Sequence, residues 1–198
     1  MKDTNFDFKI KDLKFHIDGL VPKNTCNSFI ELFENHNDKA VKESSYKYNE
    51  KKNVQDNFTC LNLTELSAVD NNFTEPLNVA KKYLFIMIKN YTFYLQNNVS
   101  SNFDDKLISN SSNIRILKYD VGQHIKDHSD VDGTIRASCT LNLNEDYEGG
   151  EFRFFNGRIK ESFKTGDAMI FPAEPLWIHG TEPITKGARY SINCFLHA

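Results

Sequence analysis

Two residues with metal-binding side chains, His128 and Asp130, are separated by a single residue in this sequence. On an extended segment, positions i and i+2 point the same way, so the imidazole and the carboxylate can converge on one ion. A third ligand is available at His179, within Trp177-Ile178-His179-Gly180. Two histidines and one carboxylate form the facial set that holds non-haem Fe(II) and leaves positions open for oxygen chemistry.

A carboxylate receptor follows His179 along the chain. Arg189 and Ser191 share one face of a predicted strand, where they offer a guanidinium fork and a hydroxyl group. An arginine on a strand is otherwise a solvated edge residue. The two features together therefore predict a metal site beside a pocket for a small acid.

From residue 114 to 196 the sequence resembles the Fe(II)/2-oxoglutarate-dependent oxygenases, and within them the prolyl 4-hydroxylase-like group. The motifs that carry the resemblance occur in the family's order. They are Tyr119-x-x-Gly122-Gln123, His128-x-Asp130, Leu143-Asn144, Tyr147-Glu148-Gly149-Gly150-Glu151-Phe152, Gly166-Asp167-Ala168, Phe171-Pro172, His179 with Pro183, and Gly187-x-Arg189-Tyr190-Ser191.

The resemblance implies a set of ligands and a reaction. His128, Asp130 and His179 would bind Fe(II), while Arg189, Ser191 and Tyr119 would bind the distal carboxylate of 2-oxoglutarate. Dioxygen would be the oxidant, with ascorbate as an accessory reductant. Oxidative decarboxylation of 2-oxoglutarate would give succinate and CO2 while a substrate C–H bond is hydroxylated.

The resemblance also indicates the substrate, a prolyl residue of a peptide or protein. Collagen-type relatives usually carry Lys at the position of Arg189, and because Arg and Lys bind carboxylates differently, the collagen-type reading is disfavoured. Asn142 stands where many relatives have a Tyr that contacts 2-oxoglutarate, so those contacts are expected to be rearranged. Arg136 and Trp177 are candidate substrate contacts; Arg136 is equally well a sheet-surface charge, and Trp177 equally well fills the barrel.

Other functions remain open at this point. The same chemistry could act on a free amino acid, another side chain or a small metabolite. A non-catalytic jelly-roll binding module and a zinc hydrolase with the same three ligands are less favoured, because zinc prefers tetrahedral sites and would give Arg189 and Ser191 no role.

The elements that must position these residues divide the chain into a helical first part and a strand-rich second part. Apolar residues at helical spacing predict helices over residues 24–36 and from Thr74, the expected N-cap, to about residue 95. From residue 114 the period becomes two, which predicts antiparallel strands. Those strands cover residues 114–119, 136–143, 151–155, 168–171 and 189–196.

These patterns, with the resemblance, predict an α+β protein that is mainly β. We expect a double-stranded β-helix of the jelly-roll or cupin type, with N-terminal helices packed on one sheet. One domain should cover residues 1–198, with 1–113 as helical support and 114–198 as the catalytic core. Residues 42–72 are polar without a sustained period, which predicts a mobile loop that covers the substrate.

The composition excludes several classes of protein. With 39% hydrophobic and 26% charged residues and a net charge of −3, the chain is neither disordered nor generally cationic, so nucleic acid is a disfavoured partner. Its longest apolar run, residues 83–88, is too short for a membrane helix. The N-terminus has no apolar signal segment, which predicts a cytoplasmic protein. Four cysteines without a Cys-x-x-Cys pair are expected to be reduced and buried, and oligomeric state is left open.

Overall fold

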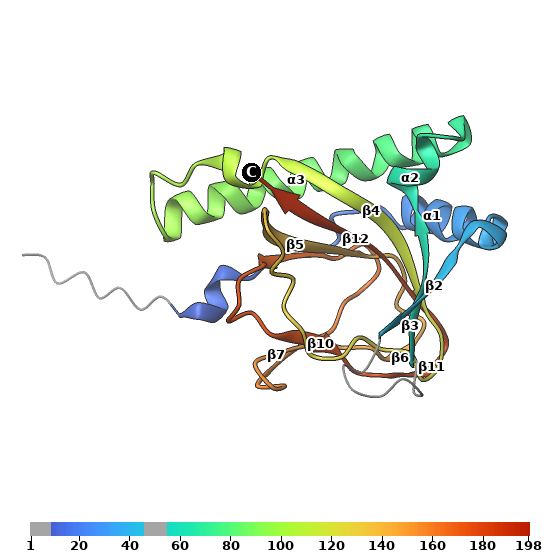
Figure 1. Ribbon diagram of the computed structural model, residues 1–198. Coiled ribbons are helices and arrows are strands. Elements are labelled where there is room, and N and C mark those ends of the chain that lie inside the picture. Colours follow the sequence, from blue (N-terminus) through green and yellow to red (C-terminus); the bar gives the residue numbers. More distant parts are fainter. Residues whose placement is uncertain (1–8, 46–54) are drawn as a thin grey trace, which may run out of the picture.

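A seven-stranded antiparallel sheet dominates the computed structural model, which describes residues 9–45 and 55–198 (Figure 1). The strands lie in the order β1-β9-β5-β12-β4-β3-β2. Their bounds are β1 Phe15–Ile17, β9 Ala168–Pro172, β5 Ile135–Asn142, β12 Arg189–His197, β4 Asn110–Tyr119, β3 Gln55–Asn62 and β2 Val41–Ser45.

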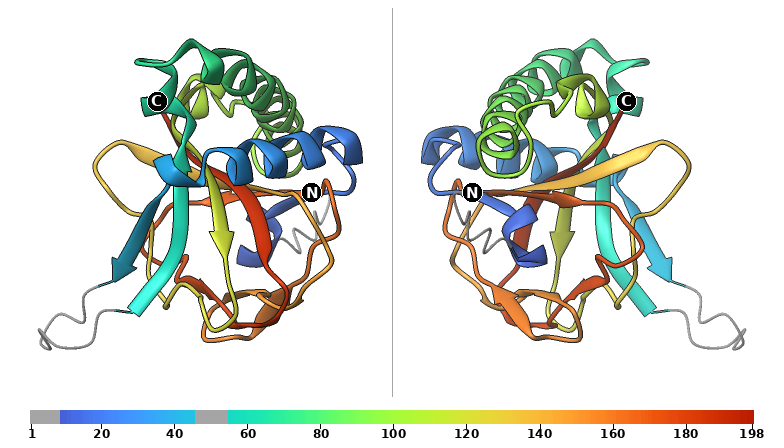
Figure 2. Two further views of the ribbon diagram at one scale, coloured as in Figure 1. Left: turned by 90° about the vertical axis from the view of Figure 1, so that its right-hand side faces the viewer. Right: turned by 90° about the vertical axis from the view of Figure 1, so that its left-hand side faces the viewer.

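Two small antiparallel sheets lie across from the main sheet and close a barrel (Figure 2). One has the order β10-β7-β8 and the other pairs β11 with β6. Their bounds are β10 His179–Thr181, β7 Phe152–Phe154, β8 Ile159–Glu161, β11 Ile184–Lys186 and β6 Glu148–Gly149. The predicted antiparallel double-stranded β-helix is therefore confirmed.

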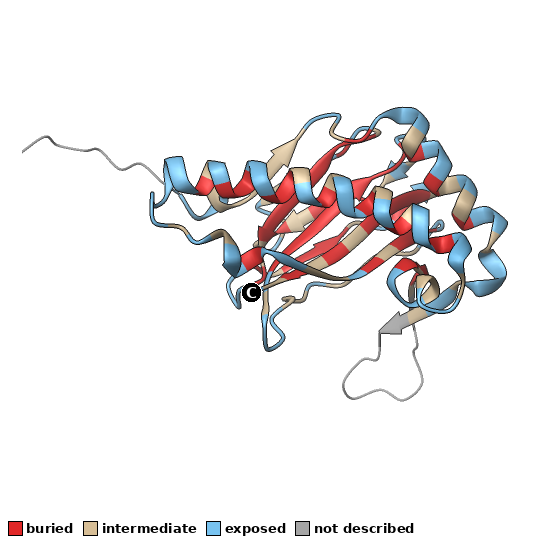
Figure 3. Cartoon of the chain, turned by 90° about the horizontal axis from the view of Figure 1, so that it is seen from above, coloured by how far each residue is buried: buried red, intermediate tan, exposed pale blue. Residues whose placement is uncertain are grey.

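The helices cover the outer face of the main sheet (Figures 1 and 3). They are α1 Lys23–Asn35, α2 Leu63–Ser67 and α3 Thr74–Asn98, with short 3-10 turns at Ile10–Leu13, Asn37–Lys39, Asn71–Phe73 and Asp105–Ile108. The apolar stripe of α3 is buried against the sheet as predicted. Its members are Leu77, Ala80, Leu84, Met87, Ile88, Tyr91 and Leu95. Helices packed on one sheet are thus confirmed.

The start of α3 differs from the prediction. Thr74 is the first helical residue and not the N-cap, which is Phe73, and no side chain caps the helix there. The reason is the 3-10 turn Asn71–Phe73, which runs directly into the helix and is itself capped by Asp70. Pro76 lies in the first turn of α3, where a proline is tolerated because the N–H that it lacks would have no partner within the helix.

The predicted loop over residues 42–72 is wrong in the part that the structure describes. Strands β2 and β3 extend the main sheet beyond β4, and α2 and a 3-10 turn follow them. Residues 46–54 lie outside the described residues. Phe58 and Cys60 alternate into an inner apolar cluster with Leu117 and Tyr119, which is a strand pattern that the surrounding Lys and Asn residues obscure in the sequence.

Alternation along the central strands gives the main sheet two different faces. On the helix side lie apolar residues, and on the barrel side lie polar ones. The helix-side residues of β5 and β12 are Ala137, Cys139, Leu141, Tyr190, Ile192, Cys194 and Leu196. The barrel-side residues are Ser138, Thr140, Asn142, Arg189, Ser191 and Asn193. The sheet therefore separates the main core from the interior of the barrel.

Two further expectations concern the cysteines and membranes. Cys26, Cys60, Cys139 and Cys194 are all buried free thiols, as expected. Within residues 9–45 and 55–198, none of the helices combines the length and the apolar character that crossing a bilayer requires.

Candidate metal centre and its cavity

Three predicted ligands come together at one end of the barrel. His128 and Asp130 lie in the connection between β4 and β5, and His179 begins β10. His128 and His179 exchange two backbone hydrogen bonds of 2.9 Å, which hold their rings 4.4 Å apart. The Nε2 atoms lie 3.1 Å (His128) and 3.4 Å (His179) from the Asp130 carboxylate oxygens.

Both histidine rings are fixed in the tautomer that a metal needs. Nδ1 of His128 lies 2.8 Å from the carbonyl oxygen of Lys126, and Nδ1 of His179 lies 3.0 Å from that of Trp177. Because a carbonyl only accepts, Nδ1 must carry the proton in each ring. Nε2 of each ring faces Asp130 and is the atom left to bind a metal once it carries no proton, and such backbone anchoring is the usual support of a metal-binding histidine.

The electrostatics of the group favour an ionised Asp130. Burial alone would raise the pKa of its carboxyl group, but the hydrogen bond from His128 and the nearby His179 and Ser138 bring that pKa below its usual value. Ser138 Oγ donates to Asp130 Oδ2 at 2.5 Å. Burial lowers the pKa of His179, whereas Asp130 raises the pKa of His128 despite its burial. One carboxylate beside a neutral imidazole is a donor set for a divalent cation.

The three residues line a cavity of about 560 Å³ inside the barrel. Near the histidines its wall includes the aromatic rings of Phe152 and Phe171. Farther along, the wall is formed by β2, β4 and β12, with Glu43, Arg115 and Asn193. The candidate ligands therefore face a partly apolar space large enough for small molecules.

Arg189 lies buried in the barrel interior and not at a solvated sheet edge. It is 1% exposed, and its Nε donates to Asn142 Oδ1 at 3.0 Å while Nη1 donates to the carbonyl oxygen of Gly150 at 3.3 Å. Its Nη2 is buried without a hydrogen-bond partner. Arg189 itself does not line the cavity, but Phe152, whose ring lies 5.1 Å from the guanidinium carbon, does.

Gly150 allows this arrangement because it has no side chain. Its φ is +74°, and an added Cβ would lie 2.5 Å from Cδ1 of Ile184 and 3.5 Å from Cδ of Arg189. Gly149, with φ of +81°, would clash with the carbonyl oxygen of Pro183. The pair permits a tight turn, and the turn presents the carbonyl group of Gly150 to Arg189.

The other two predicted co-substrate residues lie next to Arg189. Tyr119 pairs with Arg189 across β4 and β12, and its ring lies 5.6 Å from the guanidinium carbon. Burial raises the pKa of Tyr119 to about 12, so the phenol is neutral. Ser191 is 1% exposed and donates to Asn193 Oδ1 at 3.0 Å.

The two predicted substrate residues do not line the cavity. Arg136 is exposed and donates to the carbonyl oxygens of Gly133 and Ile135, both at 3.3 Å. Trp177 is 2% exposed and packs among Phe154, Phe155 and Phe171. This geometry favours the surface-charge reading of Arg136 and the barrel-filling reading of Trp177.

The sequence did not identify the residues that hold Arg189 and Asp130 in place. Asn142 is fully buried, and its Oδ1 accepts from Arg189 and, at 3.4 Å, from Tyr147. The sequence showed that Asn142 stands where many relatives have a Tyr. That Asn142 holds Arg189 could not be predicted, because this contact depends on the register between β5 and β12. Ser138 gave no signal beyond its place on the polar face of a predicted strand.

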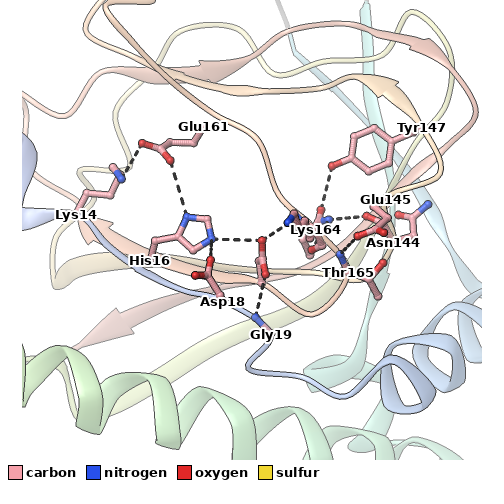
Figure 4. A network of polar contacts seen from close by, with 12 residues as sticks. Lys14, His16, Asp18, Gly19, Asn144, Glu145, Tyr147, Glu161, Lys164 and Thr165 are labelled. Atoms are coloured by element: carbon pink, nitrogen blue, oxygen red, sulfur yellow. Dashed lines mark hydrogen bonds and ion pairs between the residues drawn. The ribbon is translucent and has the colours of Figure 1, made fainter.

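A second group of potential ligands consists of His16, Asp18 and Asp167. Figure 4 shows His16 and Asp18 of this group at the end of β1. Both oxygens of Asp167 accept backbone N–H groups, from Gly19 at 2.9 Å and Lys164 at 2.7 Å. The Asp18 side chain is 98% exposed. We assign this group to stabilising the turn before β9.

Comparisons with known proteins agree with this geometry. Residues 114–197 match the family model described as the 2OG-Fe(II) oxygenase superfamily. A PKHD-type hydroxylase of Janthinobacterium sp. (strain Marseille) is 36% identical over 90 residues, which cover 37% of this chain and 38% of that relative. The match thus spans under two fifths of the length of the curated relatives.

Solved structures extend the likeness to most of the chain. One is a prolyl hydroxylase from Trichoplax adhaerens in complex with a hypoxia inducible factor oxygen degradation domain peptide fragment. It has a TM-score of 0.66 at 14% identity and covers 94% of this chain and 84% of its own. A Pseudomonas putida prolyl-4-hydroxylase has a TM-score of 0.59 at 13% identity and covers 95% and 96%. The resemblance and the fold that it implied are confirmed.

Proposed function

We propose that this protein, whose residues 114–197 match the 2OG-Fe(II) oxygenase superfamily, is an Fe(II)- and 2-oxoglutarate-dependent dioxygenase that hydroxylates a C–H bond. The observation that carries the proposal is the convergence of His128, Asp130 and His179 on the wall of one cavity. Their ligand atoms all lie within 4.8 Å of one another.

The three side chains fit a ferrous ion. Two imidazoles supply neutral nitrogen donors whose Nδ1–H groups are already bound to carbonyl groups, and Asp130 supplies one negative charge. Three protein ligands on one side leave the other coordination positions for co-substrate and oxygen, which a closed four-ligand zinc site would not do. His128, Asp130 and His179 would hold the metal.

Arg189 fits the distal carboxylate of 2-oxoglutarate. Its Nη2 is a buried donor without a partner, although Nε and Nη1 are held by Asn142 and Gly150. A buried unpaired donor costs free energy, and a carboxylate arriving at this position would remove that cost through a charge-assisted hydrogen bond. Tyr119 and Ser191 adjoin Arg189, and we assign them to the same co-substrate pocket.

When bound, iron with 2-oxoglutarate and dioxygen supplies the oxidising chemistry that decarboxylates 2-oxoglutarate to succinate and hydroxylates the substrate. The protein's contribution is placement and shielding. His128 and His179 are oriented by backbone carbonyl groups, and Asp130 is oriented by Ser138. The rings of Phe152 and Phe171 pack beside His179 and give this part of the cavity wall an apolar surface.

We propose a prolyl residue of a peptide or protein as the substrate class. The support is the fold likeness to prolyl hydroxylases, one of them solved with a peptide, and the sequence likeness to PKHD-type hydroxylases. The alternative with the same chemistry is a free amino acid or another small molecule, which the cavity of about 560 Å³ could also admit.

The test is anaerobic addition of Fe(II) and 2-oxoglutarate, followed by the metal-to-ligand charge-transfer band and by succinate release in air. Wild type is expected to show the band, and His179→Ala is expected to lose it together with succinate release. His124→Ala is the matched control, since His124 lies on the same connection but is not among the three ligands.

A second variant distinguishes metal binding from 2-oxoglutarate binding. Arg189→Ala should keep iron binding but raise the 2-oxoglutarate requirement by at least about 30-fold, because a buried charged partner is lost. Absence of the band in wild type, or zinc-dependent hydrolysis without 2-oxoglutarate, would contradict the proposed function.

A further inference from the structure

A second arginine, Arg115, lies on the wall of the same cavity. It belongs to β4 and shares the barrel-facing side of that strand with Leu117 and Tyr119. The cavity that contains His128, Asp130 and His179 is lined by Arg115 as well. Arg115 is therefore placed to meet a molecule that occupies the space in front of the candidate metal ligands.

The guanidinium group of Arg115 is held on one side and unsatisfied on the other. Its Nη1 lies 3.4 Å from Glu43 Oε1, which is a long contact, and its carbon lies 5.4 Å from the centre of the Phe195 ring. Its Nε is buried and has no hydrogen-bond partner. With only 16% of the side chain exposed, water does little to satisfy these donors.

The neighbouring polar groups leave hydrogen-bond donors on this wall. Thr140 and Ser191 both donate to Asn193 Oδ1, at 3.1 and 3.0 Å. That arrangement makes the remaining amide nitrogen of Asn193 a donor, and Asn193 lines the cavity beside Arg115. A ligand group here must therefore accept hydrogen bonds.

Three acids and a second cation, Lys126, also line the cavity. Asp127 is paired with Arg153 at 2.9 Å, and Asp130 belongs to the candidate metal set. Glu43 is the acid that faces Arg115, and its side chain is 44% exposed. Arg115 is thus a cation of the cavity wall with a buried donor, Nε, that the protein leaves unpaired.

We propose that Arg115 binds a carboxylate of the substrate, so that the molecule to be hydroxylated is an acid. This inference rests on the proposed function and deepens it. The carboxylate is either the α-carboxylate of a free amino acid or the acidic side chain of a residue beside the hydroxylated one in a peptide. Arg189, which lies in a separate buried cluster with Asn142 and Gly150, holds the co-substrate acid.

Under this proposal, substitutions of Glu43 and of Arg115 should change the binding of an acidic substrate in opposite directions. It competes with an incoming carboxylate for Nη1 of Arg115 and repels it as a like charge. Removing its charge should therefore strengthen the binding of an acidic substrate, whereas removing the charge of Arg115 should weaken it.

The test uses the Fe(II) and 2-oxoglutarate holoenzyme with pairs of compounds that differ only by carboxylate and carboxamide. One pair is L-proline and L-prolinamide, and the other is an end-blocked Pro-Glu dipeptide and its Pro-Gln counterpart. Substrate-stimulated succinate release gives KM for each member, and the more responsive pair identifies the source of the carboxylate. Wild type should prefer the acid by at least about tenfold in KM.

Four variants complete the experiment. Arg115→Gln should abolish the preference for the acid without raising the 2-oxoglutarate requirement, Arg115→Lys should restore part of it, and Glu43→Gln should increase it. Lys118→Gln is the matched control, because Lys118 is on the same strand but pairs with Glu34 of α1 on the opposite face.

The outcomes separate the two proposals. An unchanged preference in Arg115→Gln, equal response to acids and amides, or no response to either acid overturns the carboxylate subsite while the charge-transfer band still supports the oxygenase. A raised 2-oxoglutarate requirement in Arg115→Gln assigns Arg115 to the co-substrate and also overturns the inference. Loss of the band in wild type overturns both.

Discussion

The two faces of the main sheet are built from the same strands but satisfy opposite requirements. On the helix side, residues such as Ile192 and Leu141 are fully buried among other apolar side chains. On the barrel side, Arg115 and Arg189 each keep a buried nitrogen without a partner. The comparison teaches that apolar packing closes the helix face of these strands, whereas their barrel face keeps unsatisfied polar groups that ligands can complete.

The largest expected effect tests the helix face. Phe33→Ala removes a fully buried ring that packs edge-on against Tyr190 at 5.8 Å. It should lower the free energy of unfolding by about 3–5 kcal/mol, because a cavity replaces the ring. Urea denaturation measures this loss, and turnover per folded molecule should not change.

Phe85→Ala is the matched control for this substitution. Phe85 is 59% exposed on α3, so its loss should change stability by less than about 0.5 kcal/mol. Equal effects of the two substitutions, or a selective loss of turnover in Phe33→Ala, would break the division between the faces.

The next effect concerns the barrel face. Asn142→Ala removes the oxygen that accepts from Arg189 Nε and leaves a second buried donor unpaired. The guanidinium group should lose its fixed orientation, and KM for 2-oxoglutarate should rise about tenfold, or ~1.4 kcal/mol. Iron affinity, measured separately, should stay constant. A parallel loss of iron affinity would show that Asn142 supports the whole barrel and does not specifically position Arg189.

The smallest expected effect concerns the hydrogen bonds that join Glu34 of α1 to the helix face of the sheet. Glu34 of α1 accepts from the Tyr190 hydroxyl at 2.5 Å and from Lys118 at 2.9 Å, and its pKa is lowered, chiefly by the Tyr190 hydrogen bond. Because the folded state favours the ionised form, its contribution is present above the ordinary value of 4.5 and is lost as pH falls through the lowered pKa. Glu34→Gln should therefore cost under about 1 kcal/mol at pH 7, since the side chain is partly exposed.

Urea titrations of this variant at pH 7 and at pH 3 measure the effect. The difference from wild type should shrink at the lower pH, and Glu31→Gln on the same helix is the control. If the difference in the free energy of unfolding between Glu34→Gln and wild type is the same at both pH values, Glu34 stabilises the protein through packing and not through its charge.

The sequence predicts the local features of the candidate site better than the contacts between distant segments. Period-two alternation placed Arg189 and Ser191 on one side of a strand, and the spacing of His128 and Asp130 suggested a shared ion; both inferences use only local geometry. The pairing of β3 with β4, the orientation of Arg189 by Asn142 and the contact of Arg115 with Glu43 join distant segments. No local pattern encodes such contacts, because register across a sheet is set by the assembled core.

Strands β2 and β3 form the outer edge of the main sheet, beyond β4, and Glu43 and Phe58 from this pair line the cavity. The candidate iron ligands all come from residues 128–179, far away in the chain. Part of the cavity wall and the candidate metal ligands therefore come from separate segments of the chain. We expect that exchanging strands β2 and β3 for those of a relative would alter which molecules the cavity admits and would leave the ladder of β4, β12 and β5 intact.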